Sequence, residues 1–125
     1  MLQKFTNRDI ANTIIGLNNF KRGSSKKPVK LMYAINRNLD HLRTAVKPFE
    51  TSRQEIISKY FETNEAGKLV PIDGKKETAE SEMSELLEIE IEVEIHKIPI
   101  DIIDGIEVSG EEFDAIDFMI EGGEQ

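Results

Sequence analysis

The longest regular pattern of apolar positions in this chain runs from Pro28 to Phe61. Its steps alternate between three and four residues, which is the a/d spacing of a heptad repeat and predicts one long amphipathic helix. Such a helix would be about 50 Å long, more than the diameter of a small domain. We therefore expect other segments, or a second copy of the chain, to cover its apolar stripe. The stripe, which we predict to serve self-association, consists of Met32, Ile35, Leu39, Leu42, Val46, Phe49, Ile56 and Tyr60.

Two residues, Pro48 and Arg53, are unusual in an amphipathic helix of this kind. Pro48 removes a backbone hydrogen bond, but the apolar spacing continues past it without a change of phase. We therefore predict one continuous, kinked helix rather than two helices joined by a loop. Arg53 occupies an a position of the stripe, where its side chain should either extend toward water or pair with an acidic residue of another segment.

The pattern changes from a helical period to a period of two near residue 88. Strict alternation of isoleucine or valine with glutamate over 88–95 predicts a strand with one apolar and one acidic face. A strand needs a hydrogen-bonding partner, and the alternatives are residues 69–72, residues 106–108 or the same strand of another subunit. Glutamates two residues apart repel each other, so the acidic face favours a cationic neighbour. This face, which we predict to bind a partner, consists of Glu88, Glu90, Glu92 and Glu94.

Shorter elements flank these two segments. Thr6 or Asn7 can cap a first helix, and an extended piece over 69–72 lies between two turn signals. A third helix beginning near Thr78 should return antiparallel along the long helix, because its length and polarity suit that position. The first helix presents one apolar face, made of Ile10, Ile14 and Leu17.

A last helix closes the pattern. Ser109 and Glu112 have the spacing of a capping box, and the helix should stop at Gly122-Gly123. Its inward-facing residues are Phe113, Ile116, Met119 and Ile120. Together these elements predict a single domain over residues 1–125 of the α+β class: mainly helical, with a long kinked amphipathic helix, shorter helices and a small β-sheet.

The charge of the chain divides it into two parts. Residues 1–60 hold 12 Lys and Arg against four acids (+8), whereas residues 61–125 hold four Lys against 20 acids (−16), and together these give the net charge of −8. We accordingly distinguish a basic helical part, 1–61, from an acidic α+β part, 62–121. Such an asymmetry indicates either that the two parts dock on each other or that each faces a charged partner.

The basic part offers a candidate anion site in the loop before the long helix. Lys26, Lys27 and Lys30 lie where a basic loop meets a helix N-terminus, an arrangement that can hold a phosphate. The glycine spacing of a P-loop is missing, so a solvated linker is the simpler interpretation. Binding of nucleic acid is disfavoured, because aromatic side chains for stacking are scarce here and the acidic part would repel a polyanion.

The residue types argue against an enzyme. The chain has no cysteine, and none of its serines lies in a nucleophile elbow. Its two histidines, His41 and His96, lack metal-ligand spacing, although His96 could bind a metal together with Glu94. The acidic run before Asp117 departs from a calcium loop, because Ile103 stands where a ligand is needed. We therefore expect no catalytic residues, no metal site and no cofactor.

The location also follows from hydropathy. No apolar run approaches the length of about 20 residues that a membrane span requires, and the N-terminal residues lack the apolar core of a signal peptide. We expect a cytoplasmic protein without a membrane partner.

The order of these elements resembles that of a broad group of small proteins encoded by bacteriophages and prophages, many of which are known only as domains of unknown function. The similarity spans residues 28–121. It rests on the basic heptad helix and on three stretches that follow it, KYFETNEAGKLVPIDGKKE, ELLEIEIEVEIHKIPI and SGEEFDAIDFMIE.

The resemblance implies a non-enzymatic accessory protein in the host cytoplasm that works by protein–protein interaction and self-association as a homo-oligomer. The alternative it implies is an anti-defence protein. Such a protein would inhibit a host defence protein through nucleic-acid-like acidic charge, or sequester an anionic nucleotide signal with its lysines.

Overall fold

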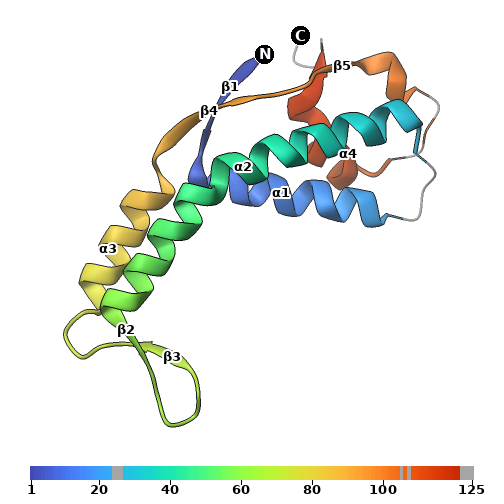
Figure 1. Cartoon of the computed structure of the whole chain (residues 1–125). Helices are drawn as coiled ribbons and strands as arrows, with labels where there is room; N and C mark the ends of the chain where they lie inside the picture. Colours follow the sequence, from blue (N-terminus) through green and yellow to red (C-terminus); the bar gives the residue numbers. More distant parts are fainter. Residues whose placement is uncertain (24–26, 105, 107, 122–125) are drawn as a thin grey trace.

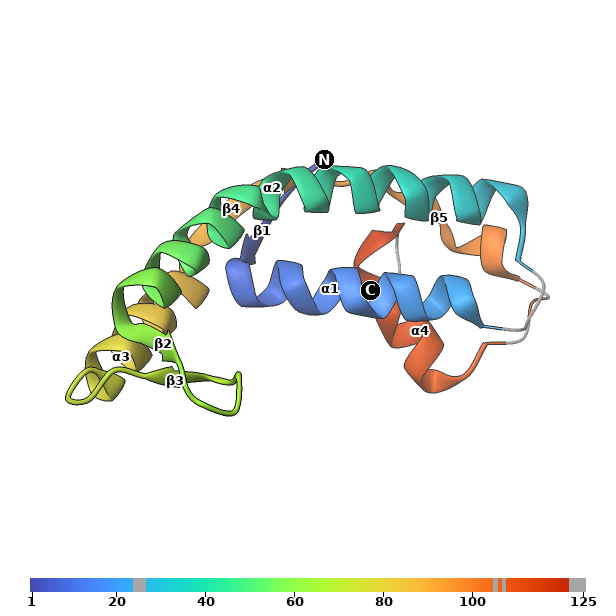
Figure 2. The same cartoon turned by 60° about the horizontal axis from the view of Figure 1, so that its bottom comes forward.

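The organising element is α2, one helix over Val29–Tyr60 that contains Pro48 in its interior. The structure is a computed structural model that describes residues 1–23, 27–104, 106 and 108–121. Figures 1 and 2 show that α2 changes direction along its length. The prediction of a continuous, kinked helix is therefore confirmed. Pro28 precedes the first helical residue as the N-cap.

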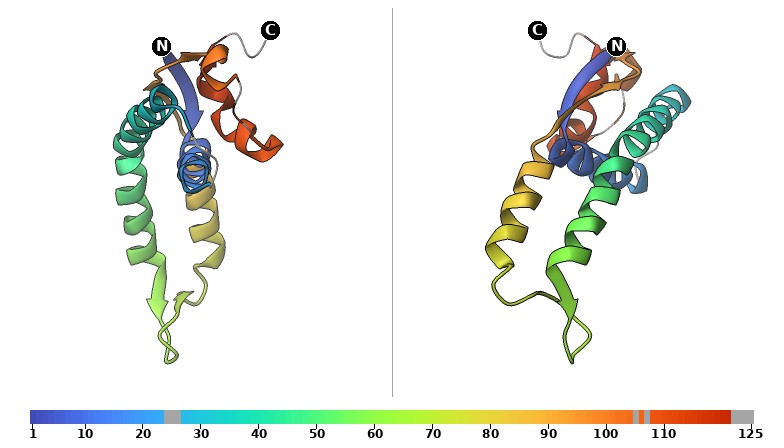
Figure 3. Two further views of the ribbon diagram at one scale, coloured as in Figure 1. Left: turned by 90° about the vertical axis from the view of Figure 1, so that its right-hand side faces the viewer. Right: turned by 60° about the vertical axis from the view of Figure 1, so that its left-hand side comes forward.

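Two helices pack along α2, and a further one packs on the first of these. The first part of α2 lies beside α1 (Asn7–Arg22), and its second part lies beside α3 (Lys76–Leu87), which returns antiparallel as predicted (Figure 2). On the side of α1 away from α2 lies α4 (Gly110–Ile116; Figure 3). The side chain of Thr6 caps α1 and forms a capping box with Asp9, which confirms the first predicted helix start.

An antiparallel ribbon of two strands crosses α2. Its strands are β1 (Leu2–Thr6) and β4 (Glu90–Glu94), with Phe5 opposite Ile91. The prediction that β4 pairs with residues 69–72 or with residues 106–108 is wrong, because its partner is β1 of the same chain. Pairing of β4 with the same strand of another subunit stays a prediction. The signal in β1 is weak: Phe5 is its one buried residue, and the alternation is too short to mark a strand.

Two further pairs of strands are small. The antiparallel pair β2 (Phe61–Thr63) and β3 (Leu69–Pro71) forms a hairpin at the far end of α2 and α3 (Figures 1 and 3). The parallel pair is β5 (Ile98–Pro99) and β6 (Ile120–Glu121). The predicted extended piece after residue 68 is confirmed, but the described residues form three two-stranded sheets rather than one.

The C-terminal helix is shorter than predicted. The capping box is present, since the backbone N–H of Glu112 donates to Ser109 Oγ at 3.1 Å. However, α4 ends at Ile116 and continues as a 3-10 turn over Asp117–Met119, because the next residues pair as β6 with β5. A second 3-10 turn follows β5 at Ile100–Ile103. The predicted stop at Gly122-Gly123 lies outside the described residues.

One apolar core joins the basic and the acidic parts of the chain. Its members come from α1, α2, β4 and the C-terminal segment, so both parts are needed to bury it. Its fully buried large side chains include Ile10, Leu17, Phe20, Leu31, Ile35, Leu39, Leu42, Ile95, Ile116, Met119 and Ile120.

A single buried amide connects α2 to the end of β4. The side chain of Asn38 is fully buried. Its Nδ2 donates to the carbonyl oxygen of His96 at 3.1 Å, and its Oδ1 accepts from the His96 backbone N–H at 2.7 Å. The amide therefore satisfies the backbone N–H and the carbonyl oxygen of His96, as the backbone of a third strand would if the ribbon had one.

Candidate functional site

The predicted self-association stripe lies against the rest of its own chain. Five of its eight residues are buried within the single chain: Ile35, Leu39, Leu42, Val46 and Ile56. A second copy could therefore contact only the half-buried members, Met32, Phe49 and Tyr60. Arg53 is exposed, in agreement with the alternative in which its side chain extends toward water.

Tyr60 uses its hydroxyl group inside the chain. It donates to Glu82 Oε2 on α3 at 2.7 Å. This hydrogen bond, together with partial burial and the negative charge of Glu82, raises the pKa of Tyr60 above its ordinary value of 10.0. Because the folded-state pKa is the higher one, the bond stabilises the fold below about pH 10 and is lost as the pH rises through the raised pKa.

We expect Glu82→Ala to return the pKa of Tyr60 toward its ordinary value, because the acceptor and its charge are both removed. The measurement is ultraviolet absorbance of the phenolate in a Tyr33→Phe background, which leaves Tyr60 as the remaining tyrosine. The control is Glu85→Ala, an exposed residue of the same helix. An identical titration in both variants would contradict the Tyr60–Glu82 bond.

The predicted acidic face is exposed to solvent. Glu90, Glu92 and Glu94 share one face of β4, and Glu88 follows α3 as its C-cap. Two of the four have cationic partners: Arg8 Nη2 lies 3.0 Å from Glu88 Oε2, and the amino group of Met1 contacts Glu94.

The pKa of Glu94 shows what a cation does at this face. The hydrogen bond from the amino group of Met1 holds that pKa below its ordinary value, and the positive charges of His41 and Arg37 act in the same direction. A carboxylate with a lowered pKa is one whose charged form is favoured by its neighbours. At Glu94 the neighbouring cations therefore favour the charged carboxylate.

The basic and acidic parts dock mainly through the shared apolar core. Ion pairs also join them in the described ranges, among them Arg8 with Glu88 and the Met1 amino group with Glu94. Most of the acidic side chains on α3 and β4 are exposed. Internal docking thus takes place, but it leaves the negative charge of the acidic part largely uncompensated.

The rings of the two histidines have different neighbours in the fold. His41 Nδ1 lies 2.7 Å from the carbonyl oxygen of Glu94, and since a carbonyl can only accept, Nδ1 carries the proton. The ring of His96 packs edge-on against Tyr33 at 6.2 Å between centroids. Among the described residues, no three His, Asp or Glu side chains are grouped so as to hold a metal ion.

The three candidate anion-binding lysines do not form a described cluster. Lys26 lies outside the described residues. Lys27 donates to the carbonyl oxygen of Gly23 at 3.1 Å and sits over the ring of Phe20 at 5.1 Å, so it is already engaged. Lys30 is exposed in the first turn of α2.

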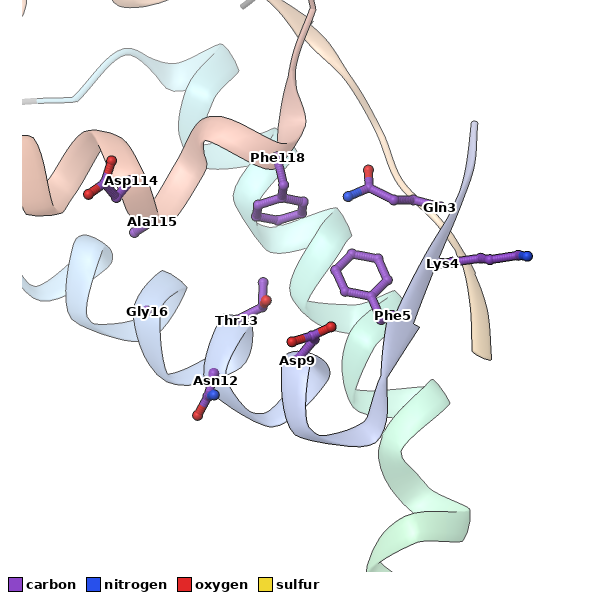
Figure 4. A pocket seen from close by; sticks show the side chains of 10 residues that line it. All are labelled: Gln3, Lys4, Phe5, Asp9, Asn12, Thr13, Gly16, Asp114, Ala115 and Phe118. Carbon is purple, nitrogen blue, oxygen red and sulfur yellow. The ribbon is translucent and has the colours of Figure 1, made fainter. Parts of the chain in front are cut away.

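The structure also contains a pocket that the sequence pattern did not indicate. It has a volume of about 380 Å³ and lies between β1, α1 and α4 (Figure 4). Phe5 and Phe118 form one wall, with ring centroids 6.1 Å apart and planes at 82°. Because its residues come from both ends of the chain, no local pattern could have brought them together.

The comparisons with known proteins identify no relative of this chain. None of the helices in the described ranges combines the length and the apolar character that crossing a lipid bilayer requires. Comparisons with protein-family models, with curated proteins and with solved structures found no match.

Proposed function

We propose that this protein is a non-enzymatic binding protein whose acidic face, Glu88, Glu90, Glu92 and Glu94, contacts a basic partner. The observation that carries the proposal is the exposure of these carboxylates, of which Glu90 and Glu92 lie in no ion pair of the described residues. Same-face glutamates about 7 Å apart repel by about 0.6 kcal/mol per pair even in water. A cationic partner replaces this repulsion by attraction.

The test is binding of a synthetic peptide of alternating arginine and serine, whose cations repeat with the period of the strand. We expect Glu90→Gln/Glu92→Gln to weaken binding at low salt about tenfold or more, because each lost contact between opposite charges is worth about 1 kcal/mol in water. Calorimetry at two salt concentrations provides the measurement, and the affinity should fall as salt rises.

The matched control is Glu62→Gln/Glu65→Gln, which removes two exposed charges of the β2–β3 hairpin region. It should change the affinity by less than about twofold, apart from the general effect of net charge. Equal losses in the two double variants would mean that the peptide responds to total charge, and the assignment of the acidic face would be wrong.

The anti-defence alternative uses the same face with a different partner. A host protein that normally binds nucleic acid would meet Glu88, Glu90, Glu92 and Glu94 in place of phosphates. Duplex DNA should then compete with this protein for the partner captured from a host lysate. The route through Lys26, Lys27 and Lys30 would show instead as binding of a cyclic nucleotide in calorimetry.

Self-association stays a separate prediction. With the stripe largely buried inside one chain, a homo-oligomer would have to use other surfaces or the half-buried Met32, Phe49 and Tyr60. Light scattering over a range of concentrations measures it, and a constant monomer mass would contradict it.

A further inference from the structure

The pocket in Figure 4 has a second cavity beside it, also lined by residues of α1 and α4. A second cavity of about 350 Å³ shares Gly16 and Ala115 with the first. These two small residues let the helices approach, since a Cβ added at Gly16 would lie 3.6 Å from the Cβ of Ala115. The close approach of Gly16 and Ala115 therefore lies between two neighbouring cavities, one beside β1 and one further along α1.

Five side chains converge on the first cavity. Figure 4 shows Gln3, Phe5, Asp9, Thr13 and Phe118 around one space, whereas Lys4 points away from it. The space is therefore bordered by two aromatic rings, one carboxylate, one amide and one hydroxyl group. Asp9 Oδ2 accepts a hydrogen bond from the Thr6 backbone N–H at 3.3 Å, which holds its carboxylate in position at the start of α1.

The side chains that line the two cavities carry a net negative charge. Asp9 and Asp114 line the first cavity, Glu111 and Glu112 line the second, and Lys4 is the one cation among the lining residues of both. An acidic pocket with an aromatic wall favours a cation with a flat, weakly hydrated face. A guanidinium group has this shape, and its five N–H donors match the acceptors that Asp9, Gln3 and Thr13 offer.

We propose that this pocket binds an arginine side chain of a partner protein, with its guanidinium against the half-buried ring of Phe118, behind which Phe5 is buried, and hydrogen-bonded to Asp9. This inference rests on the proposed function in taking the partner to be basic. It adds a second contact on a different part of the surface, because Gln3 and Phe5 face the core side of the β1–β4 ribbon and the acidic face lies on the other. The pocket would bind arginine selectively, whereas the acidic face would bind a cationic residue through its charge alone.

The experiment uses N-acetyl-argininamide as the probe and its neutral isostere, N-acetyl-citrullinamide, as the comparison. In a titration of the isotope-labelled protein followed by NMR, the arginine compound should cause saturable shifts at the amides of Gln3, Thr13 and Phe118. The citrulline compound should cause none at the same concentrations. Equal shifts from both compounds would overturn the proposal.

Two pocket variants test the contacts. Asp9→Asn keeps an acceptor for the Thr6 N–H and should weaken binding of the arginine compound about fivefold. Phe118→Leu removes the ring and should weaken it about two- to fivefold. The control is Asp40→Asn, the same charge change at an exposed site of α2, which should leave the affinity within twofold. Melting curves establish that each variant is folded, and unchanged affinity in a folded pocket variant overturns the proposal.

The outcomes for the pocket and for the proposed function are distinct. If the arginine compound fails to shift the pocket amides while the arginine–serine peptide still depends on Glu90 and Glu92, the pocket proposal falls and the proposed function stands. If the peptide is insensitive to Glu90→Gln/Glu92→Gln but the arginine compound binds as described, the acidic face falls and the pocket remains.

Discussion

Replacing Asn38 with alanine is expected to lower the free energy of unfolding by about 2–5 kcal/mol. The variant leaves the N–H and the carbonyl oxygen of His96 without the partners that the Asn38 amide now supplies. Each buried polar group left unpaired costs about 1–3 kcal/mol. Because Asn38 is fully buried, the alanine also leaves a space that nothing fills.

The matched control is Asn36→Ala, an exposed residue two positions away on the same helix. Alanine is the better helix former, so this change should raise stability by up to about 0.7 kcal/mol. Urea denaturation followed by circular dichroism gives both values. A loss below about 1 kcal/mol for Asn38→Ala would show that water satisfies His96 and that the amide is dispensable.

Leu42→Ala is the second change with a large expected effect, a loss of about 2–5 kcal/mol in the free energy of unfolding. Leu42 belongs to the apolar stripe of α2, and its side chain is fully buried within the single chain. The loss reflects removal of apolar contacts and the cavity left in a packed core. The same denaturation experiment measures it.

Val29→Ala provides the contrast, because Val29 lies on the same helix with 84% of its surface exposed. It should change stability by less than about 0.5 kcal/mol. The loss in Leu42→Ala should also be independent of protein concentration, since the stripe is covered by the same chain. A loss that shrinks as concentration rises would mean that a second copy covers Leu42.

The long helix was predictable because its signal is local and repeated. Stripe positions recur every three or four residues from Met32 to Tyr60, all of them apolar except Arg53, and the phase runs through Pro48. The same pattern could not say what covers the stripe. A heptad stripe is compatible with a partner chain or with intramolecular packing, and only the path of α1 and α3 decides between them.

The strand β4 was predictable for the same reason, and its partner was not. Alternation over eight residues marks a strand, but β1 contains one buried residue, Phe5, beside the polar Gln3 and Lys4. Pairing between distant segments depends on the register of the whole fold, which local propensity does not encode.

The candidate sites also differ in whether their residues lie close together in the sequence. The acidic face could be predicted, because Glu90, Glu92 and Glu94 alternate within a single strand. The pocket beside Phe118 could not be predicted, because Phe5 and Asp9 meet Phe118 only after the chain has folded. The anion-binding lysines stay a prediction, because Lys26 lies outside the described residues and Lys27 contacts Gly23 and Phe20.

The pairing of β1 with β4 has a consequence for the order of events during synthesis. The last residue of β1, Thr6, lies opposite Glu90 of β4, and Asn7, which follows it, donates to the carbonyl oxygen of Leu86, 79 positions away in the chain. During translation β1 therefore leaves the ribosome long before its partner exists, and α1 and α2 can pair first because they are adjacent in sequence. The nascent chain carries an unpaired strand through most of its elongation, and closing so large a loop makes the ribbon a late step of folding.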